Sequence, residues 1–578
     1  MIRPNFREKN MSYRTMRLFV VLALSAIAAV SLAGSPPQGE SNSFDVLIRN
    51  AHVIDGTGSP WYEADVGIRG GRIAAIGRLR DASATKEIDA RGRVVAPGFI
   101  DMLGQSDLTI LVDPRLPSKI YQGITTEVTG EGSSVAPLND AIMRADRLAY
   151  VHFKVTPDWR TLGQYFARLE RQSIGINVAD YVGATQVRRM VIGDADRAPT
   201  SSELDQMRAL VKQAMQEGAV GVSTSLQYAP APYAKTDELI ALASEAARFG
   251  GIYATHIRNE GDNEMAALAE AVRIGREAKI PVEIWHLKSA GKPNWGKMPQ
   301  VVEFIQHARD EGVDISANTY AYPAWLNSLS AFVPPWAHDG GDAKMIERLR
   351  DPAMRQRIKQ DMRTPSKEWD NEWQEIPGPE SILISAVQNE KLLPLQGKTI
   401  AQIATDRHAD PMDTIFDILI EDAGYTYASV FAMDEHDVAL ALKQPWTSIC
   451  NDSQGTSPEG ILGKEHPHPR AYGTFPRILK KYVREENLVT LSDAIRKFSA
   501  LPAQKMGFTD RGVLKAGMWA DIVVFDPQTI HDVATFEKPN QLSEGMEYVL
   551  VNGVPVIEEG RMTGAHPGTV LRGPGYRH

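Results

Sequence analysis

The chain has 578 residues and a formal charge of −9, from 63 Lys and Arg against 72 Asp and Glu. Hydrophobic residues make up 43% and charged residues 23%, a globular composition that excludes wholesale disorder. With a mild acidic excess and no basic stripe, nucleic acid is not an expected partner. A single cysteine excludes an intrachain disulfide and a multi-cysteine metal site, so the 13 histidines are the first candidates for metal ligands.

The N-terminus has the pattern of an export signal. Arg14 and Arg17 precede an apolar run over residues 18–33 that ends in small residues. A cationic start, a short apolar segment and a small-residue end are typical of a cleavable secretory signal. A membrane anchor is the alternative, but the run is shorter than the roughly 20 residues that a spanning helix needs. We predict a signal peptide at residues 1–33 and a linker at 34–43. The protein is then periplasmic or secreted, with no stable membrane association after cleavage.

Short strands separated by turns are expected near both ends of the chain. The expected strands are residues 44–49, 72–76, 93–95, 521–525 and 548–551. Gly70-Gly71 and Asn552-Gly553 are dipeptides that favour hairpin turns. Because the two ends share this pattern, they are expected to form one small β-sandwich from residues 44–96 and 506–578.

Between these ends, apolar strands alternate with helices. The expected strands are residues 123–129, 218–223, 251–255, 282–285, 314–317 and 446–449, and the expected helices are 203–216, 266–278, 301–311 and 491–499. This repeat predicts an α/β fold, a (β/α)8 TIM-like barrel over residues 97–505. An open doubly wound sheet is the alternative, which the lack of a Gly-x-Gly-x-x-Gly turn weakens. A Trp- and Pro-rich insertion at about residues 325–375 is expected to be a lid.

Four chemically active side chains come directly after predicted barrel strands: Glu131, His256, His286 and Asp452. Barrel enzymes carry their chemistry where the C-terminal ends of the strands meet. Two imidazoles and two carboxylates at that face are able to bind one divalent metal and leave a carboxylate for proton transfer. Zn2+ accepts these ligands in catalytic sites and lowers the pKa of its water towards 7. Taken singly, each residue also fits a structural role, such as a helix cap.

The same residues lie in motifs that resemble the N-acyl-D-amino-acid deacylase (D-aminoacylase) family of the amidohydrolase superfamily. Two of these motifs are Thr255-His-Ile-Arg-Asn-Glu-Gly-Asp262 and His286-Leu-Lys-Ser-Ala-Gly291. Further matches are residues 44–58, 96–101, 123–126, 217–224, 451–453, 469–477 and 520–525. The resemblance covers nearly all of the chain after the signal, and it implies a (β/α)8 barrel with a small β-sandwich formed from both chain ends.

The sequence departs from the pattern of the family in two motifs. Its His-x-His pair on the first barrel strand is replaced by Leu103 and Gln105, and its zinc-binding cysteine is replaced by Glu131. The resemblance therefore implies a variant branch with one tightly bound Zn2+, held by Glu131, His256 and His286. A second ion is not expected.

The resemblance also implies roles for the other polar residues. Asp452 is the implied general acid and base, and Tyr228 is expected to donate a hydrogen bond to the tetrahedral oxyanion. Lys288, Tyr320 and Arg470 match positions that hold the substrate carboxylate. The expected reaction is hydrolysis of small-molecule N-acyl amino acids, in particular N-acyl-D-amino acids, by zinc-activated water. A cyclic-amide or dipeptide hydrolase with the same barrel is one alternative, and a metal-free, non-catalytic binding protein is another.

Overall fold

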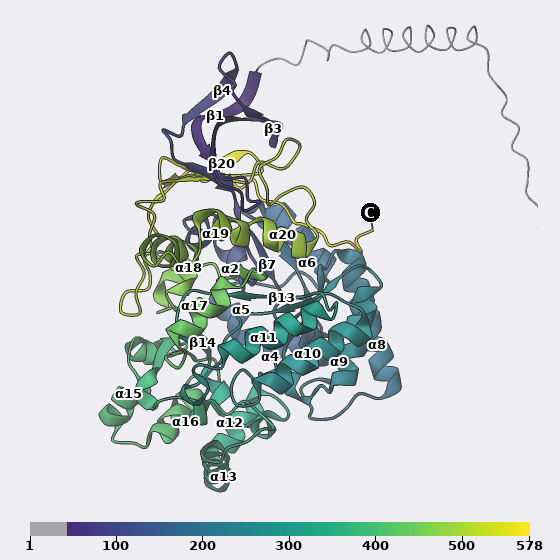
Figure 1. Ribbon diagram of the computed structural model, residues 1–578. Coiled ribbons are helices and arrows are strands. Elements are labelled where there is room, and N and C mark those ends of the chain that lie inside the picture. The colour runs from purple at the N-terminus through teal and green to yellow at the C-terminus, as the bar shows by residue number, and fades with distance from the viewer. Residues whose placement is uncertain (1–42, 578) are drawn as a thin grey trace, which may run out of the picture.

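The computed structural model describes residues 43–577, so the predicted signal peptide and all of the linker except Ser43 lie outside the described residues. Strands from the two ends of the chain form one sheet, purple and yellow in Figure 1, in the order β21-β20-β19-β18-β5-β1-β2-β3 with β4 beside β1. Their bounds are β1 (Ser43–Val53), β2 (Tyr62–Arg69), β3 (Arg72–Gly77), β4 (Ser83–Asp89), β5 (Val94–Pro97), β18 (Ile522–Phe525), β19 (Met546–Val551), β20 (Val554–Glu558) and β21 (Arg561–Met562). The N-terminal and C-terminal parts meet where β5 pairs antiparallel with β18.

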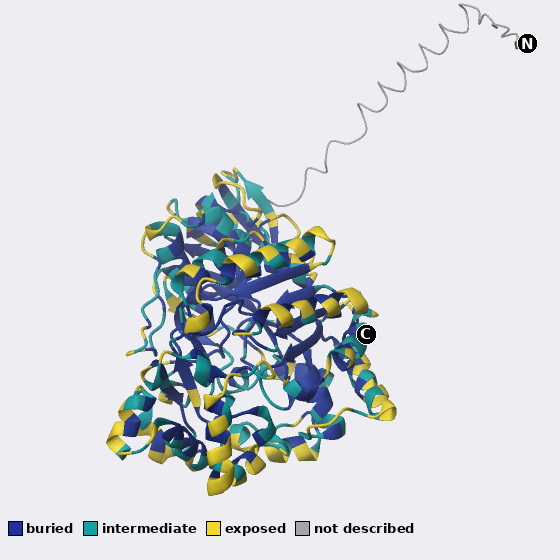
Figure 2. Cartoon of the chain, turned by 60° about the horizontal axis from the view of Figure 1, so that its bottom comes forward, coloured by how far each residue is buried: buried dark blue, intermediate teal, exposed yellow. Residues whose placement is uncertain are grey.

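A second set of strands is parallel throughout and forms two sheets, β6-β7-β8 and β17-β13-β12-β11-β10-β9. Their bounds are β6 (Phe99–Asp101), β7 (Ile124–Thr129), β8 (Asn177–Asp180), β9 (Val182–Gly183), β10 (Gly221–Ser225), β11 (Ile252–His256), β12 (Val282–Ile284), β13 (Ile315–Thr319) and β17 (Thr447–Ile449). Only Tyr181 separates β8 from β9, so these two continue one strand position. Every residue of these strands is buried, as expected for parallel strands covered on both faces (Figure 2).

The first and last strand positions are joined just beyond their C-terminal ends. The backbone N–H of Asp452 donates to the carbonyl oxygen of Leu103 at 3.0 Å, which links the chain after β17 to the chain after β6. The fully buried ammonium of Lys119 reinforces this junction, because it lies 2.6 Å from Asp101 Oδ2 and 2.8 Å from the carbonyl oxygen of Ser453. These contacts close the eight strand positions into a ring and place the residues after β6 beside those after β17.

Helices surround this ring; the long ones, such as Ser201–Glu217 and Glu264–Ala278, bury one face and expose the other, whereas short ones such as Pro117–Ile120 are wholly buried. The helices are α2 (Thr109–Val112), α3 (Pro117–Ile120), α4 (Asp140–Ala145), α5 (Arg147–Phe153), α6 (Leu162–Gln172), α7 (Ala184–Ile192), α8 (Ser201–Glu217), α9 (Thr236–Ala247), α10 (Glu264–Ala278), α11 (Met298–Asp310), α17 (Glu435–Lys443), α18 (Arg470–Arg477), α19 (Leu491–Phe498) and α20 (Ala500–Met506). A capping box formed by Thr200 and Glu203 begins α8, which covers the helix predicted at residues 203–216. Within the described residues, none of the helices is long and apolar enough to span a membrane.

The insertion after β13 is longer than the predicted residues 325–375. It contains an antiparallel sheet in the order β14-β16-β15, and it ends with β16 at Val430. Its elements are β14 (Trp325–Ser328), α12 (Asp342–Arg350), α13 (Pro352–Arg363), α14 (Glu372–Glu375), β15 (Ile382–Ala386), α15 (Ile400–Arg407), α16 (Pro411–Glu421) and β16 (Tyr427–Val430). The lid predicted at about residues 325–375 corresponds to the first part of this insertion, from β14 to α14, and its role as a lid stays a prediction. We call this insertion, residues 325–430, the lid segment.

Candidate metal centre and active site

Glu131, His256 and His286 lie together at the C-terminal end of the barrel. Each offers one ligand atom, and these atoms are within 4.8 Å of one another. Glu131 Oε1 is 3.4 Å from His256 Nδ1 and 3.8 Å from His286 Nε2. Zinc binds oxygen and nitrogen at about 2.0–2.2 Å, so the donors of one tetrahedral site lie about 3.3–3.6 Å apart. The donor types therefore fit one zinc ion; the Glu131–His256 spacing lies within this range, and the 3.8 Å between Glu131 and His286 needs only a small shift to reach it.

Two of the site residues, His286 and Asp452, have strained backbone conformations. His256 is the last residue of β11, whereas His286 and Asp452 follow β12 and β17 in left-handed backbone conformations, with φ of 37° and 49°. Such conformations cost non-glycine residues on the order of 1–3 kcal/mol and persist where surrounding contacts fix them. One such contact is the 2.7 Å hydrogen bond from the backbone N–H of His286 to Asn318 Oδ1.

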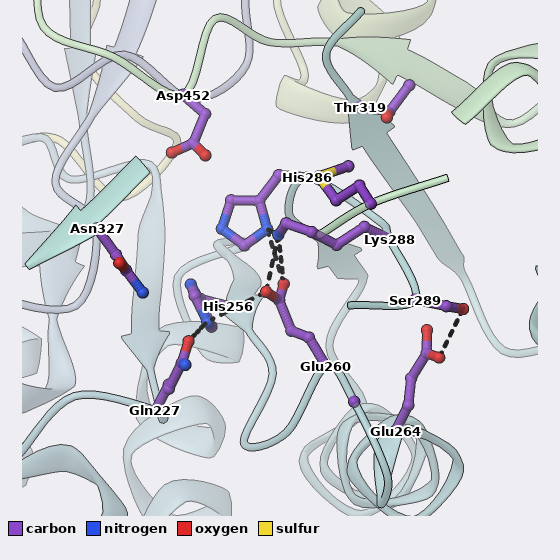
Figure 3. A network of polar contacts seen from close by, with 12 residues as sticks. Gln227, His256, Glu260, Glu264, His286, Lys288, Ser289, Thr319, Asn327 and Asp452 are labelled. Carbon is purple, nitrogen blue, oxygen red and sulfur yellow. Dashed lines mark hydrogen bonds and ion pairs between the residues drawn. The ribbon is translucent and has the colours of Figure 1, made fainter. Parts of the chain in front are cut away.

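The ring nitrogen of each histidine that faces away from Glu131 has its own partner (Figure 3). His256 Nε2 is 2.8 Å from Gln227 Oε1, and His286 Nδ1 is 3.0 Å from Glu260 Oε1. Lys288 Nζ also lies 2.9 Å from His286 Nδ1. An imidazole that gives one nitrogen to a metal carries its proton on the other, so with a metal bound these nitrogens would donate to Gln227 and Glu260. Lys288 Nζ lies 2.7 and 2.8 Å from the two oxygens of Glu260. Burial works to raise the pKa of Glu260, but Lys288 and the histidines outweigh it and hold the pKa well below its usual value.

Opposing charges also set the protonation of the ligands themselves. Burial works to raise the pKa of Glu131, but hydrogen bonds from His256 and His286 outweigh it and keep the pKa well below its usual value. Burial and the Lys288 ammonium lower the pKa of His286, whereas Asp452 and other nearby carboxylates raise it to about 9. A metal ligand must be neutral imidazole, so zinc binding displaces a proton from this group.

Asp452 lies near His286 in Figure 3. Its carboxylate is held from two sides. Arg470 Nη1 is 2.8 Å from Asp452 Oδ2, and Gln105 Nε2 donates to Asp452 Oδ1 at 3.1 Å. Burial raises the pKa of Asp452, and the charges of Arg470 and His286 oppose this rise. The result is a buried, oriented carboxylate with increased proton affinity, which suits a general base.

The remaining predicted residues lie in the same connected group. The rings of Tyr228 and His256 are 5.0 Å apart in an edge-on arrangement, and burial raises the pKa of Tyr228 well above its usual value, so its hydroxyl remains a donor. The Arg470 guanidinium lies 4.7 Å from the centre of the Tyr320 ring, and Lys288 Nζ lies 5.9 Å from it. All eight residues singled out in the sequence therefore meet at one place, and their individual roles stay predictions.

The sequence analysis did not single out the residues that support this group from outside. Besides Gln227 and Glu260, the lid segment contributes Glu372, whose Oε1 accepts hydrogen bonds from Gln227 Nε2 at 2.7 Å and from Asn327. Burial raises the pKa of Glu372 to about 8, so this carboxyl is mostly protonated at neutral pH. No signal for this role was present in the sequence, because three acids within residues 370–375 are typical of an exposed segment, whereas Asp370, Glu372 and Glu375 are buried in the structure.

Comparison with models of known protein families identifies the class of protein to which the chain belongs. Residues 86–557 match the model of the amidohydrolase family, and residues 30–98 match that of the urease alpha-subunit N-terminal domain. The chain is therefore a metal-dependent amidohydrolase, a hydrolase of carbon–nitrogen bonds other than peptide bonds, with the (β/α)8 barrel fold and the terminal β-domain of that class.

Relatives that match over nearly their full length identify the family within the amidohydrolases. The chain is 37% identical to a D-aminoacylase of Alcaligenes xylosoxydans xylosoxydans (92% of this chain and 99% of that protein) and 36% identical to an N-acyl-D-glutamate deacylase of the same organism (91% and 96%). The crystal structure of an N-acyl-D-glutamate deacylase from Bordetella bronchiseptica, complexed with zinc and a phosphonate inhibitor, is 34% identical, with a TM-score of 0.77 and coverage of 92% and 100%. The chain belongs to the N-acyl-D-amino-acid deacylase family, which confirms the predicted family and fold class.

Two further structures bear on the metal and on the alternative reaction. A D-aminoacylase structure at 34% identity, with a TM-score of 0.76 and coverage of 92% and 100%, is described as having a binuclear metal centre with one-metal activation and second-metal attenuation. A metal cofactor is thus a property of this family. A D-hydantoinase structure at 16% identity, with a TM-score of 0.52 and coverage of 92% and 100%, shares the fold alone.

The Glu260 contacts generate a prediction about metal affinity. Glu260→Gln removes the charge that orients the His286 ring and leaves Lys288 without its anion, so zinc affinity is expected to fall about 10–100-fold. Competition with a chromophoric chelator measures this. The matched control is Glu264→Gln, because Glu264 is a nearby buried acid whose Oε2 accepts from Ser289 Oγ at 2.8 Å and whose pKa burial raises well above its usual value. An equal loss of affinity in both variants would contradict the assigned role of Glu260.

Proposed function

We propose that this protein hydrolyses the amide bond of N-acyl amino acids, in particular N-acyl-D-amino acids. The observation that carries the proposal is the Glu131, His256 and His286 donor group with the oriented carboxylate of Asp452 beside it. The names of the full-length relatives supply the substrate class. In this reaction water adds across the amide bond, so that the acyl carbon leaves as a carboxylate and the nitrogen leaves in the free amino acid.

The proton transfers are assigned to this chain's own residues. Glu131, His256 and His286 would hold the zinc ion, which when bound would supply an activated water and polarise the amide carbonyl. Asp452 accepts the proton that the attacking water loses and returns it to the departing amine nitrogen. The Tyr228 hydroxyl donates a hydrogen bond to the developing oxyanion, a role commonly worth about 3 kcal/mol.

Recognition of the substrate carboxylate is assigned to Lys288, Tyr320 and Arg470. Arg470 and Lys288 are the buried cations nearest to the Tyr320 ring in the described site, and a guanidinium suits bidentate pairing with a carboxylate. Burial raises the pKa of Tyr320 well above its usual value, so its hydroxyl remains protonated and able to donate. The lid segment is proposed to cover the acyl group, since its Glu372 already contacts the site through Gln227.

A substrate panel on zinc-loaded protein tests this function. Free carboxylic acid is expected from N-acyl-D-amino acids, with little from the L-enantiomers and none from hydantoins or dipeptides.

Asp452→Asn is expected to lower kcat about 10²–10⁴-fold with KM nearly unchanged, since the amide cannot accept the proton. Zinc content of the variant is the control. Full activity of zinc-containing Asp452→Asn would refute the general-base assignment, and turnover of hydantoins or dipeptides alone would favour the alternative hydrolase. No turnover of any substrate would favour the binding protein.

Export is the second part of the proposal. The cationic and apolar pattern before the linker supports a cleaved signal and a periplasmic or secreted protein. N-terminal sequencing of the protein recovered from the periplasm or the medium is expected to begin at Gly34. Recovery from the membrane fraction with residues 18–33 still attached would instead support the membrane anchor.

A further inference from the structure

Gln105 forms a bridge between the metal centre and the catalytic carboxylate. Its Nε2 donates to Glu131 Oε2 at 2.8 Å and to Asp452 Oδ1 at 3.1 Å. A primary amide nitrogen carries two hydrogens, so it is able to serve one to each carboxylate. Its backbone N–H donates to the carbonyl oxygen of Ser453 at 3.2 Å, which anchors Gln105 at the junction of the first and last barrel strands.

This bridge occupies a place that would otherwise attract a cation. Two carboxylates that face one point repel each other unless a cation, a proton or hydrogen-bond donors lie between them. The Gln105 amide supplies two donors and no net charge. Leu103, two residues earlier in the segment that follows β6, is fully buried and has no side-chain atom able to bind a metal.

We propose that Gln105 is a positioning residue that takes, with its side-chain amide, the place of a second metal ion between Glu131 and Asp452. The centre then works with one ion. The role of Gln105 in orienting Asp452 for catalysis rests on the proposed function. The number of metal ions that the centre binds does not depend on that function.

The bridge has two consequences for the reaction. Gln105 engages Oε2 of Glu131, whereas the other oxygen, Oε1, faces the two imidazoles and accepts one hydrogen bond from Ser225 Oγ at 3.1 Å, so Oε1 is the oxygen that would bind the ion. Gln105 at Oδ1 and Arg470 at Oδ2 together fix the rotation of the Asp452 carboxylate. A cation placed between Glu131 and Asp452 would meet the positive end of the amide dipole, so the site disfavours a second ion.

Three position-matched proteins test this proposal in the zinc-loaded and Mn2+-loaded forms. The parent is expected to retain one equivalent of metal after gel filtration. Gln105→Glu replaces the two donors with a third carboxylate, so it is expected to retain two equivalents, with a spin-coupled Mn2+ EPR spectrum. Gln105→Leu keeps the volume but has neither the donors nor a ligand atom of its own, so any second ion that Glu131 and Asp452 attract is expected to bind weakly and to be lost on gel filtration, which leaves one equivalent. In Gln105→Leu, kcat is expected to fall about 10-fold with KM changed less than about 2-fold, because Glu131 and Asp452 lose a shared hydrogen-bond donor while the residues assigned to the substrate carboxylate are unchanged.

Metal analysis needs no substrate, so it separates this proposal from the proposed function. Two tightly bound equivalents in the parent, or one in folded Gln105→Glu, would overturn the replacement of a metal ion by Gln105. An unchanged kcat in Gln105→Leu would overturn the positioning role. If the Gln105→Glu protein does not fold, the parent's metal content and the kcat of Gln105→Leu decide the question. Should no substrate on the panel be cleaved, the proposed function fails while the metal count still stands as a test of Gln105.

Discussion

The site depends on the electrostatic environment of the Glu131 carboxylate. Its Oε1 faces the imidazoles of His256 and His286, and its Oε2 accepts a hydrogen bond from the side-chain amide of Gln105. A buried anion is costly unless charge or hydrogen bonds compensate it, and here His256, His286 and Gln105 all do so. The same contacts that stabilise Glu131 form a donor set for zinc. The contacts that compensate the charge of Glu131 therefore also hold the metal ligands in place before the metal binds.

Closure of the barrel makes that arrangement possible. Gln105 and Asp452 are far apart in sequence, and they meet because the chain after β6 pairs with the chain after β17. The buried Lys119 ion pair lies directly at this junction. From the opposite side, the lid segment brings the protonated Glu372 against Gln227, which in turn orients His256. The metal centre is thus held by strand pairing on one side and by a neutral carboxyl on the other.

Sequence reasoning located most of the barrel strands from their apolar runs. The runs that became β7, β10, β11, β12, β13 and β17 were all expected, and the residues after them gave the complete candidate site. The apolar pattern did not mark β6, β8 and β9, although β6 is as long as β12 and β17; the chain around β6 was noted only through the family match at residues 96–101. Glu260 and Glu372 were missed for another reason: their roles arise from tertiary burial beside Lys288 and Gln227, which local sequence does not encode. Gln105 was recognised as a departure from the family, but its two hydrogen bonds required the folded chain.

Zinc K-edge X-ray absorption of the zinc-loaded protein tests the central claim most directly. A mononuclear centre of Glu131, His256 and His286 predicts a first shell of nitrogen and oxygen only, at about 2.0–2.2 Å, with the outer-shell scattering typical of imidazole. A sulfur shell at about 2.3 Å would mean that Cys450, the one cysteine of the chain, binds the metal. A metal–metal vector at about 3.5–4 Å would show a second ion, and either result would contradict the one-ion, thiolate-free centre described above.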